Sequence, residues 1–279
     1  MSESMRAYRD CVFCVRGLVS GRKQLTTPCA GFRRGTSSSG IVPIQVQNGL
    51  LLLMIDLRAV TRSYFMGGSE VRALAGVDLS IASGEFVAIT GPSGSGKSSL
   101  LNVLGCLDRP SSGEYYLDAE RVAHLDDEHV SALRNRKIGF VFQSFFLLPR
   151  LNVLENVMLP LRYATVADPD APQRARALLD RVGLSDRLGH RPNELSGGQQ
   201  QRAAIARALV RQPRLLLADE PTGNLDSKSA ADVLNLMDEL HAEGQTIVLV
   251  THDAEIAAHA PRHVRLRDGL VEGDLRNAR

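Results

Sequence analysis

The residues from Gly91 to Ser98 have the types and the spacing of a loop that binds phosphate. They read Gly-Pro-Ser-Gly-Ser-Gly-Lys-Ser and fit the pattern G-x-x-x-x-G-K-[ST] at every fixed position. Glycines let successive backbone N–H groups point at phosphate oxygens, and a helix that begins there adds partial positive charge. Lys97 can reach the β- and γ-phosphates of a nucleotide, and the Ser98 hydroxyl suits Mg²⁺, which prefers oxygen ligands. A tight turn without a ligand is the alternative, but a predicted strand precedes the run and a predicted helix follows it, as the motif requires.

Two adjacent carboxylates form a second candidate site. Asp219 and Glu220 follow the apolar strand predicted at 215–218. The carboxyl end of a buried strand is the place where open α/β sheets bind ligands. Asp219 suits a role in holding Mg²⁺ through water, and Glu220 suits a role in orienting or deprotonating a water that attacks a γ-phosphate. The alternative is a strand end with solvated acids, and the phosphate loop upstream favours the functional interpretation.

The run Leu195-Ser196-Gly197-Gly198-Gln199 opens a predicted helix. A hydroxyl and bare amides at a helix start make a second anion-binding end, although a capped helix start without a ligand is the alternative. The phosphate loop already serves one side of a triphosphate. A second phosphate-binding element in the same chain therefore indicates that each nucleotide lies between two copies.

This run resembles the signature of the ABC ATPases, and it lies about 20 residues before Asp219, as in that family. The resemblance implies that Gln143 is the glutamine that senses Mg²⁺ and the partner, and that His252 contacts the γ-phosphate. It also implies that Tyr64 stacks on adenine, a role that the adjacent Phe65 is able to take instead. The implied nucleotide-binding residues are Tyr64, Gly91, Pro92, Ser93, Gly94, Ser95, Gly96, Lys97, Ser98, Ser99, Ser196, Gly197, Gly198, Gln199 and Asp226, the last in a loop at the dimer interface; the implied Mg²⁺ ligands are Ser98, Gln143 and Asp219; the implied catalytic residues are Glu220, His252 and Gln143.

The resemblance implies the P-loop NTPase fold of the ABC ATPases over residues 54–272: an α/β core with a mostly parallel sheet, a small antiparallel β subdomain and a helical subdomain at about 144–200. It implies an ATPase that uses ATP and Mg²⁺ and works as a homodimer on separate transmembrane permease subunits, peripheral to the cytoplasmic face of the inner membrane. No apolar run approaches the roughly 20 residues that span a bilayer, so another chain has to supply the membrane segment.

Shorter matches narrow the resemblance to the bacterial group with the macrolide-exporter and lipoprotein-release ATPases. They are Leu104–Asp108, Phe142-Gln143, Leu147–Pro149, Glu155–Val157 and Ala218–Asp226. A regulatory ATPase of a cell-division or cell-wall membrane complex shares all these motifs and stays an alternative. A soluble ABC ATPase that acts on nucleic acid or ribosomes is a second alternative, although the zinc insertions, coiled-coil arms or second cassette usual in such proteins are not recognisable here. The substrate cannot be inferred, because cargo contacts lie in other chains.

Strands and helices alternate from Met54 onward, which predicts a parallel sheet with right-handed crossovers. In this arrangement Gln143, Asp219 and His252 each follow a predicted strand. Strands are predicted at 54–60, 77–81, 85–90, 115–117, 138–142, 215–218, 246–250 and 264–270, and helices at 97–107, across much of 151–189, at 196–211 and at 230–242.

Residues 1–50 differ from the rest of the chain. They carry seven Lys and Arg against two acids, whereas residues 51–279 carry 26 bases and 29 acids, a net charge of −3. The Gly-, Ser- and Arg-rich composition indicates a disordered extension, with a transit peptide or a start at Met54 as alternatives. Cys11 and Cys14 have no second pair at zinc-site spacing, which favours free thiols over a metal or redox site. The slightly acidic body argues against a nucleic-acid partner.

The segment 145–151, shortly after Gln143, is unusually apolar. One interpretation places it in the core of the helical subdomain. The other makes it a partly exposed groove wall that receives a short helix of the membrane partner, since exposed apolar patches usually mark an interface.

Overall fold

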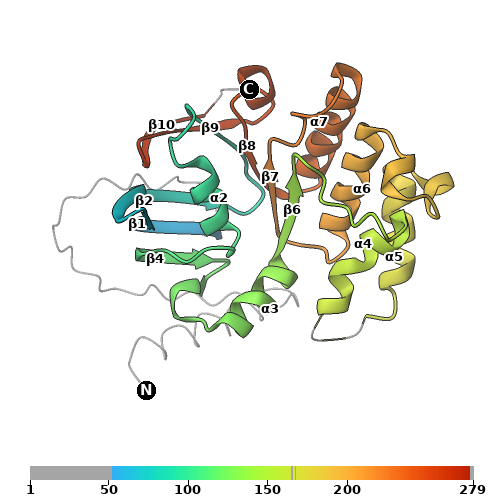
Figure 1. Ribbon diagram of the computed structural model, residues 1–279, viewed down its shortest axis with the longest axis horizontal. Coiled ribbons are helices and arrows are strands. Elements are labelled where there is room, and N and C mark those ends of the chain that lie inside the picture. Colours follow the sequence, from blue (N-terminus) through green and yellow to red (C-terminus); the bar gives the residue numbers. More distant parts are fainter. Residues whose placement is uncertain (1–51, 165, 167, 277–279) are drawn as a thin grey trace, which may run out of the picture. The chain divides into compact units, whose positions relative to one another are not determined.

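The computed structural model describes residues 52–164, 166 and 168–276 (Figure 1). The expectations about residues 1–50, including the disordered extension and the Cys11–Cys14 pair, concern residues outside these ranges. In the described part of the chain, strands and helices alternate and form two sheets with helices packed against them. None of the helices in these ranges combines the length and the apolar character that crossing a membrane needs.

The larger sheet has six strands in the order β10-β9-β3-β8-β7-β6. Neighbouring strands run parallel except at the β9–β10 edge. All of β8 and the first four residues of β7 are buried, because both strands lie inside the sheet and consist of nearly continuous apolar runs. The bounds are β3 (Phe86–Thr90), β6 (Ile138–Phe142), β7 (Leu215–Asp219), β8 (Thr246–Val250), β9 (Arg262–Arg267) and β10 (Leu270–Arg276).

The smaller sheet is antiparallel, with the order β2-β1-β4-β5. Its first two strands form a hairpin whose two-residue turn is Gly67-Gly68. Both glycines have positive φ, 57° and 86°, as a turn of type I′ requires and as glycine adopts without strain. The bounds are β1 (Leu53–Met66), β2 (Ser69–Ala82), β4 (Ser112–Leu117) and β5 (Glu120–Arg121).

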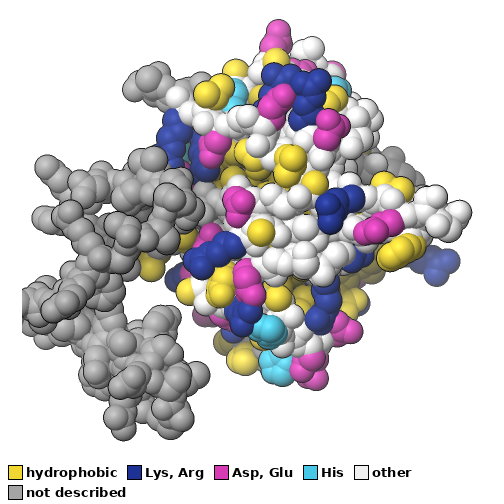
Figure 2. Space-filling model, turned by 90° about the vertical axis from the view of Figure 1, so that its left-hand side faces the viewer, with side chains coloured by type: hydrophobic (Ala, Val, Ile, Leu, Met, Phe, Trp, Pro, Cys, Tyr) yellow, Lys and Arg dark blue, Asp and Glu magenta, His cyan; other side chains and the backbone are white. Residues whose placement is uncertain are grey.

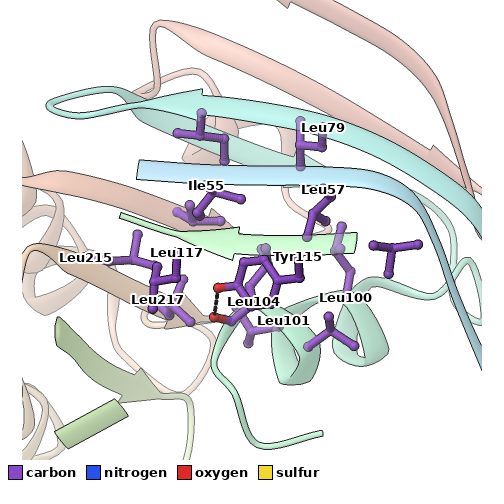
Figure 3. Packing of buried hydrophobic residues seen from close by; sticks show 14 of the residues in the cluster. Ile55, Leu57, Leu79, Leu100, Leu101, Leu104, Tyr115, Leu117, Leu215 and Leu217 are labelled. Carbon is purple, nitrogen blue, oxygen red and sulfur yellow. Dashed lines mark hydrogen bonds between the residues drawn. The ribbon is translucent and has the colours of Figure 1, made fainter. Parts of the chain in front are cut away.

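Helix α2 (Lys97–Leu104) joins the two sheets, because it contacts β2 on one side and β7 and β8 on the other. Figure 3 shows the leucines of α2 in one apolar cluster with Tyr115 of β4 and Leu217 of β7. Tyr115 is fully buried, and its hydroxyl donates to the backbone oxygen of Leu104 at 2.6 Å, which satisfies its polar atom. The phosphate loop therefore precedes a helix that is fixed in the core.

Three helices beyond β6 pack on one another: α4 (Val153–Met158), α5 (Ala171–Arg181) and α6 (Gly197–Leu209). Helix α6 also packs on β6, so it connects this helical region to the larger sheet. The remaining helices are α3 (Asp127–Lys137), α7 (Ser227–Ala242) and α8 (Ala254–Ala257), with short 3₁₀ turns η1 (Val122–His124), η2 (Leu159–Tyr163), η3 (Ser185–Arg187) and η4 (Pro192–Glu194).

Several elements differ from the sequence-based expectation, and three of them show why. Helix α3 has no counterpart among the predicted helices, because Val130 and Leu133 are its only buried apolar residues. The strand predicted at 264–270 is wrong: β9 ends at Arg267, and Asp268-Gly269, both at positive φ, turn the chain back into β10. Helix α2 ends three residues earlier than predicted, and Cys106 just beyond it has a left-handed φ of 53°.

Candidate functional site

Four of the predicted site segments follow neighbouring strands of the larger sheet. The phosphate loop follows β3, His252 follows β8, Asp219 and Glu220 end or follow β7, and Gln143 follows β6. The strands β3, β8, β7 and β6 are adjacent and parallel. Their carboxyl ends therefore lie at one edge of the sheet, which brings the four segments together where such sheets bind ligands.

The phosphate loop is held by close backbone contacts that only glycine permits. A Cβ on Gly91 would lie 2.2 Å from the backbone oxygen of Leu266, and one on Gly96 would lie 2.4 Å from that of Ala73. Both glycines also have positive φ, 151° and 100°. The Lys97 ammonium donates to the backbone oxygens of Gly91 and Pro92, each at 2.8 Å. The loop is therefore curled around its own lysine.

The other members of the loop differ in their exposure. Pro92, Ser93 and Gly94 are exposed at the tip, and Ser98 and Ser99 lie in the first turn of α2, exposed and half-buried respectively. Ser95 is buried, and within the described ranges its hydroxyl has no hydrogen-bond partner. The accessible tip and the start of α2 thus present the polar atoms that the sequence assigns to a nucleotide.

Both carboxylate oxygens of Glu220 are hydrogen-bonded. One accepts from the backbone N–H of His252 at 2.9 Å and lies 2.6 Å from Nδ1 of the same residue, and the other accepts from the Thr251 hydroxyl at 3.0 Å. The hydrogen bond and the charge of Glu220 raise the pKa of the His252 imidazole. The backbone N–H of Glu220, at a φ of 45°, donates to the Val250 oxygen at 2.9 Å. The carboxyl ends of β7 and β8 are therefore joined by a hydrogen bond, and the Glu220 carboxylate contacts the His252 imidazole.

Asp219 is half-buried directly before this pair. Burial and the charge of Glu220 raise the pKa of the Asp219 carboxyl, whereas the Lys97 ammonium lowers it. The donor set predicted for Mg²⁺ consists of this carboxylate, the Ser98 hydroxyl and the Gln143 amide oxygen. All three are hard oxygen donors of the kind that Mg²⁺ prefers, so the residues present fit the ion.

Gln143 contacts the loop that follows Glu220. Its Nε2 donates to Oδ1 of Asn224 at 3.3 Å, and Nδ2 of Asn224 donates to the backbone oxygen of Gln143 at 3.1 Å. A Cβ on Gly223 would lie 2.7 Å from the Gln143 Nε2, so a larger residue there would displace the Gln143 side chain. The glutamine and the Asn224–Asp226 loop, predicted separately from the sequence, are therefore adjacent.

The residues from Ser196 to Gln199 form a capped helix start. The Ser196 hydroxyl accepts from the Gln199 N–H at 3.3 Å, and the Ser196 N–H donates to Oε1 of Gln199 at 3.0 Å. A Cβ on Gly198 would lie 2.5 Å from the Ser229 hydroxyl, which in turn donates to Asp226 at 2.7 Å. Gly198 and Asp226 thus meet at the α6–α7 contact, and the described neighbours of Gly197 are Leu225, Asn224 and Phe145 rather than the phosphate loop of the same chain.

Tyr64 has a fixed position on the β1–β2 hairpin. Its hydroxyl donates to Asp108 at 2.8 Å, and the Arg62 guanidinium lies 4.6 Å from the centre of its ring. Arg62 also pairs with Asp108. The alternative aromatic, Phe65, is 82% exposed.

The sequence analysis assigns no contact to three residues with well-defined polar contacts near the site: Thr251, Arg207, and Asn156 of the Glu155–Val157 match. Asn156 is fully buried, and its side chain holds the loop before α4 by accepting from the Leu148 N–H at 2.7 Å and donating to the backbone oxygens of Leu148, Leu151 and Asn152. Its sequence signals are its place in the Glu155–Val157 match and its polar side chain among the apolar residues of α4. Arg207 donates to the backbone of residues 145 and 146, and nothing in the local pattern around it indicates this.

A family model described as ABC transporter matches residues 74–223. The chain belongs to the ABC transporter family. The matched range contains the phosphate loop, the Ser196–Gln199 run and the Asp219–Glu220 pair. The chain is thus one of the ATP-binding cassettes of this family, and the ATPase predicted from the sequence is confirmed.

Similar proteins of this family include the macrolide export ATP-binding/permease protein MacB of Hyphomonas neptunium, 52% identical over 224 residues, and an uncharacterized ABC transporter ATP-binding protein of Thermotoga maritima, 53% identical over 220 residues. These alignments cover 80% and 79% of the chain. The chain spans 35% of the length of the Hyphomonas protein and 94% of that of the Thermotoga protein.

Two solved structures of the ATP-binding cassette MJ0796 have the same fold, each with a TM-score of 0.74 and with coverage of 81% of this chain and 100% of theirs. One is a dimeric structure at 47% identity, and the other is a dimeric post-hydrolysis state bound to ADP and Pi at 45% identity. The predicted fold class is thereby confirmed, together with ATP as the ligand of the family.

Proposed function

We propose that this cassette works as a homodimer at the cytoplasmic face of the inner membrane and energises a separate permease, in export, lipoprotein release or mechanical transmission. Two elements in one chain carry the proposal. The phosphate loop follows β3, whereas the second anion-binding end, Ser196–Gln199, has its contacts at the α6–α7 contact. A second copy brings its own Ser196–Gln199 run to the nucleotide on the first copy, so that two ATP molecules join two chains.

The proposed roles follow from the chemistry of each group. Amides of the phosphate loop and the Lys97 ammonium neutralise the β- and γ-phosphates. Glu220 orients the attacking water and accepts its proton, and His252 contacts the γ-phosphate. Gln143 senses Mg²⁺ beside the γ-phosphate, while Tyr64 stacks on adenine. Ser98, Gln143 and Asp219 hold Mg²⁺, which neutralises charge that develops on the phosphate oxygens.

ATP-dependent dimerisation tests this function directly. With Mg·ATP, the Glu220→Gln variant should change from monomer to dimer in light scattering, because slow hydrolysis keeps the nucleotide that joins the two copies. ADP should leave the same variant monomeric, since ADP lacks the γ-phosphate between the two anion-binding ends. A variant that binds ATP and stays monomeric at high protein concentration would contradict the proposed dimer.

A groove beside Gln143 is the proposed docking site for the permease. Its volume is about 720 Å³, and its lining is largely apolar. Phe146 is 62% exposed at this groove, whereas the neighbouring Leu147 packs against the core of the helical region. The apolar run after Gln143 thus serves both the core and an exposed wall. Other apolar residues that line the groove include Leu107, Ile138, Phe140, Phe142, Leu159, Pro160 and Tyr163.

Substitution of Phe146 by Asp should abolish assembly with the permease and leave ATP binding and the fold intact, because the side chain is exposed and the charge is placed where an apolar helix would dock. Leu148 does not line the groove itself, but it is 44% exposed two residues further along the chain, and Leu148→Asp is the second variant for this test. The measurement is co-purification of the tagged chain with the permease from membranes. Leu275→Asp is the matched control, since Leu275 is 70% exposed on β10 outside the groove. Normal assembly of Phe146→Asp would place the docking surface elsewhere.

A regulatory ATPase of a cell-division or cell-wall complex is the second candidate, because it uses the same motifs and docks on membrane proteins in the same way. The identity of the co-purified membrane protein distinguishes the two. A nucleic-acid partner is not proposed. On the face shown in Figure 2, Lys and Arg side chains are interspersed with Asp and Glu, and no continuous basic area stands out, whereas binding to phosphate backbones relies on clustered positive charge.

A further inference from the structure

Two consecutive phenylalanines after Gln143 have a backbone conformation that their side chains disfavour. Phe145 has a φ of 60° and Phe146 a φ of 48°. Bulky residues rarely adopt this left-handed region, and they keep it only where the surrounding structure imposes it. The segment therefore requires a contact that holds it.

Arg207 of α6 supplies that contact. Its guanidinium donates to the backbone oxygen of Phe145 at 2.7 Å and to that of Phe146 at 2.5 Å. Burial lowers the pKa of this guanidinium. The planar fork of arginine suits two neighbouring oxygens, whereas the ammonium of lysine is a single point of charge.

The two phenyl rings contact different parts of the molecule. The ring of Phe145 lies at the start of α6, where its Cζ is 3.8 Å from the position of a Cβ on Gly197. The ring of Phe146 packs edge-on against Phe142, with centroids 5.1 Å apart, and both residues line the groove. One short backbone segment thus lies between the groove and the first glycine of the second anion-binding end.

We propose that Arg207 is a positioning residue, which holds Phe145 and Phe146 so that the start of α6 is correctly placed for the nucleotide bound by a second copy. The inference rests on the proposed function, since the start of α6 acts across the dimer.

The test compares dimerisation with nucleotide binding in the full chain. In the Glu220→Gln background, Arg207→Met should raise the dissociation constant of the Mg·ATP dimer at least about tenfold, within the usual range of coupling between sites. Mg·ATP binding to the monomer, measured by calorimetry at low protein concentration, should stay within about twofold, because the phosphate loop is untouched. Arg207→Lys should recover only part of the dimer affinity, since it lacks the fork.

Arg211→Met is the matched control. Arg211 lies one turn further along and lines the same groove, but Arg207 makes both carbonyl bonds. Phe145→Ala is a second variant, which leaves Arg207 and the backbone oxygens that it binds in place. It removes only the ring beside Gly197. It should weaken the dimer as Arg207→Met does.

The outcomes separate this inference from the proposed function. Failure of the Glu220→Gln parent to dimerise would overturn the proposed function. If the parent dimerises and the Arg207→Met or Phe145→Ala variant has the same dimer dissociation constant as the parent, the positioning role alone is overturned. Equal weakening by Arg211→Met would assign the effect to lost positive charge in the groove and would also overturn it.

Discussion

Replacement of Glu220 by Gln is expected to lower the ATPase rate by roughly 10²–10⁴-fold, the usual effect of losing a general base. The expectation follows from the two polar neighbours of the carboxylate. Glutamine has the same length, and its amide oxygen can accept from the His252 N–H as Glu220 does at 2.9 Å. Its NH₂ group then faces the Thr251 hydroxyl, which can accept instead of donate. The site thus keeps its hydrogen bonds and loses the carboxylate that we propose as the proton acceptor.

Steady-state phosphate release at saturating Mg·ATP measures this effect. The affinity of the monomer for ATP should stay near that of the parent chain, because Glu220 contacts His252 and Thr251 rather than the phosphate loop. Glu255→Gln is the matched control, because Glu255 is exposed at the start of α8. This substitution removes one negative charge, as Glu220→Gln does, but outside the site. A Glu220→Gln rate near that of the parent would remove Glu220 from the role of general base.

Those parts of the site could be predicted from the sequence whose residues follow a short local pattern, such as a loop motif or a buried strand. Glycines at 91 and 96 mark a loop whose close backbone contacts exclude a Cβ, and their spacing from Lys97 is a local property. The strands before Gln143, Asp219 and His252 are short apolar runs, and parallel strands place their carboxyl ends at one edge. Local signals and the rule for parallel strands are therefore enough to predict that the catalytic candidates lie at one edge of the sheet.

Other features depend on contacts between distant residues. Arg207 lies 62 residues after Phe145. Phenylalanine does not favour the left-handed backbone that Phe145 and Phe146 adopt, so neither the contact nor the conformation has a local sequence signal. Strand β1 continues to Met66 although its alternation breaks near Ala59, because Ala59 has a φ of 48° and the pairing with β2 shifts between Leu57 and Val60. A β-bulge inverts the side-chain period, so the predicted strand ends too early.

Replacement of Lys97 by Ala is expected to weaken Mg·ATP binding by roughly 10- to 100-fold, because a hydrogen bond to a charged group contributes about 1.5–3 kcal/mol. Lys97 is the only cation within the phosphate loop, and its ammonium already lies among the loop's backbone oxygens, 2.8 Å from those of Gly91 and Pro92. Phosphate oxygens can replace or share those bonds with little movement of the side chain.

Calorimetry with the monomeric chain measures the loss, and Lys228→Ala is the charge-matched control, since Lys228 is exposed in the first turn of α7. The same Lys97→Ala change also removes the donor to two loop oxygens, so thermal unfolding without nucleotide has to be compared. Because the loop is also held by the contacts of Gly91 and Gly96 with the backbone of Leu266 and Ala73, the unfolding temperature should change little. A variant of unchanged stability that binds Mg·ATP as tightly as the parent would show that the backbone amides and the start of α2 suffice for the triphosphate.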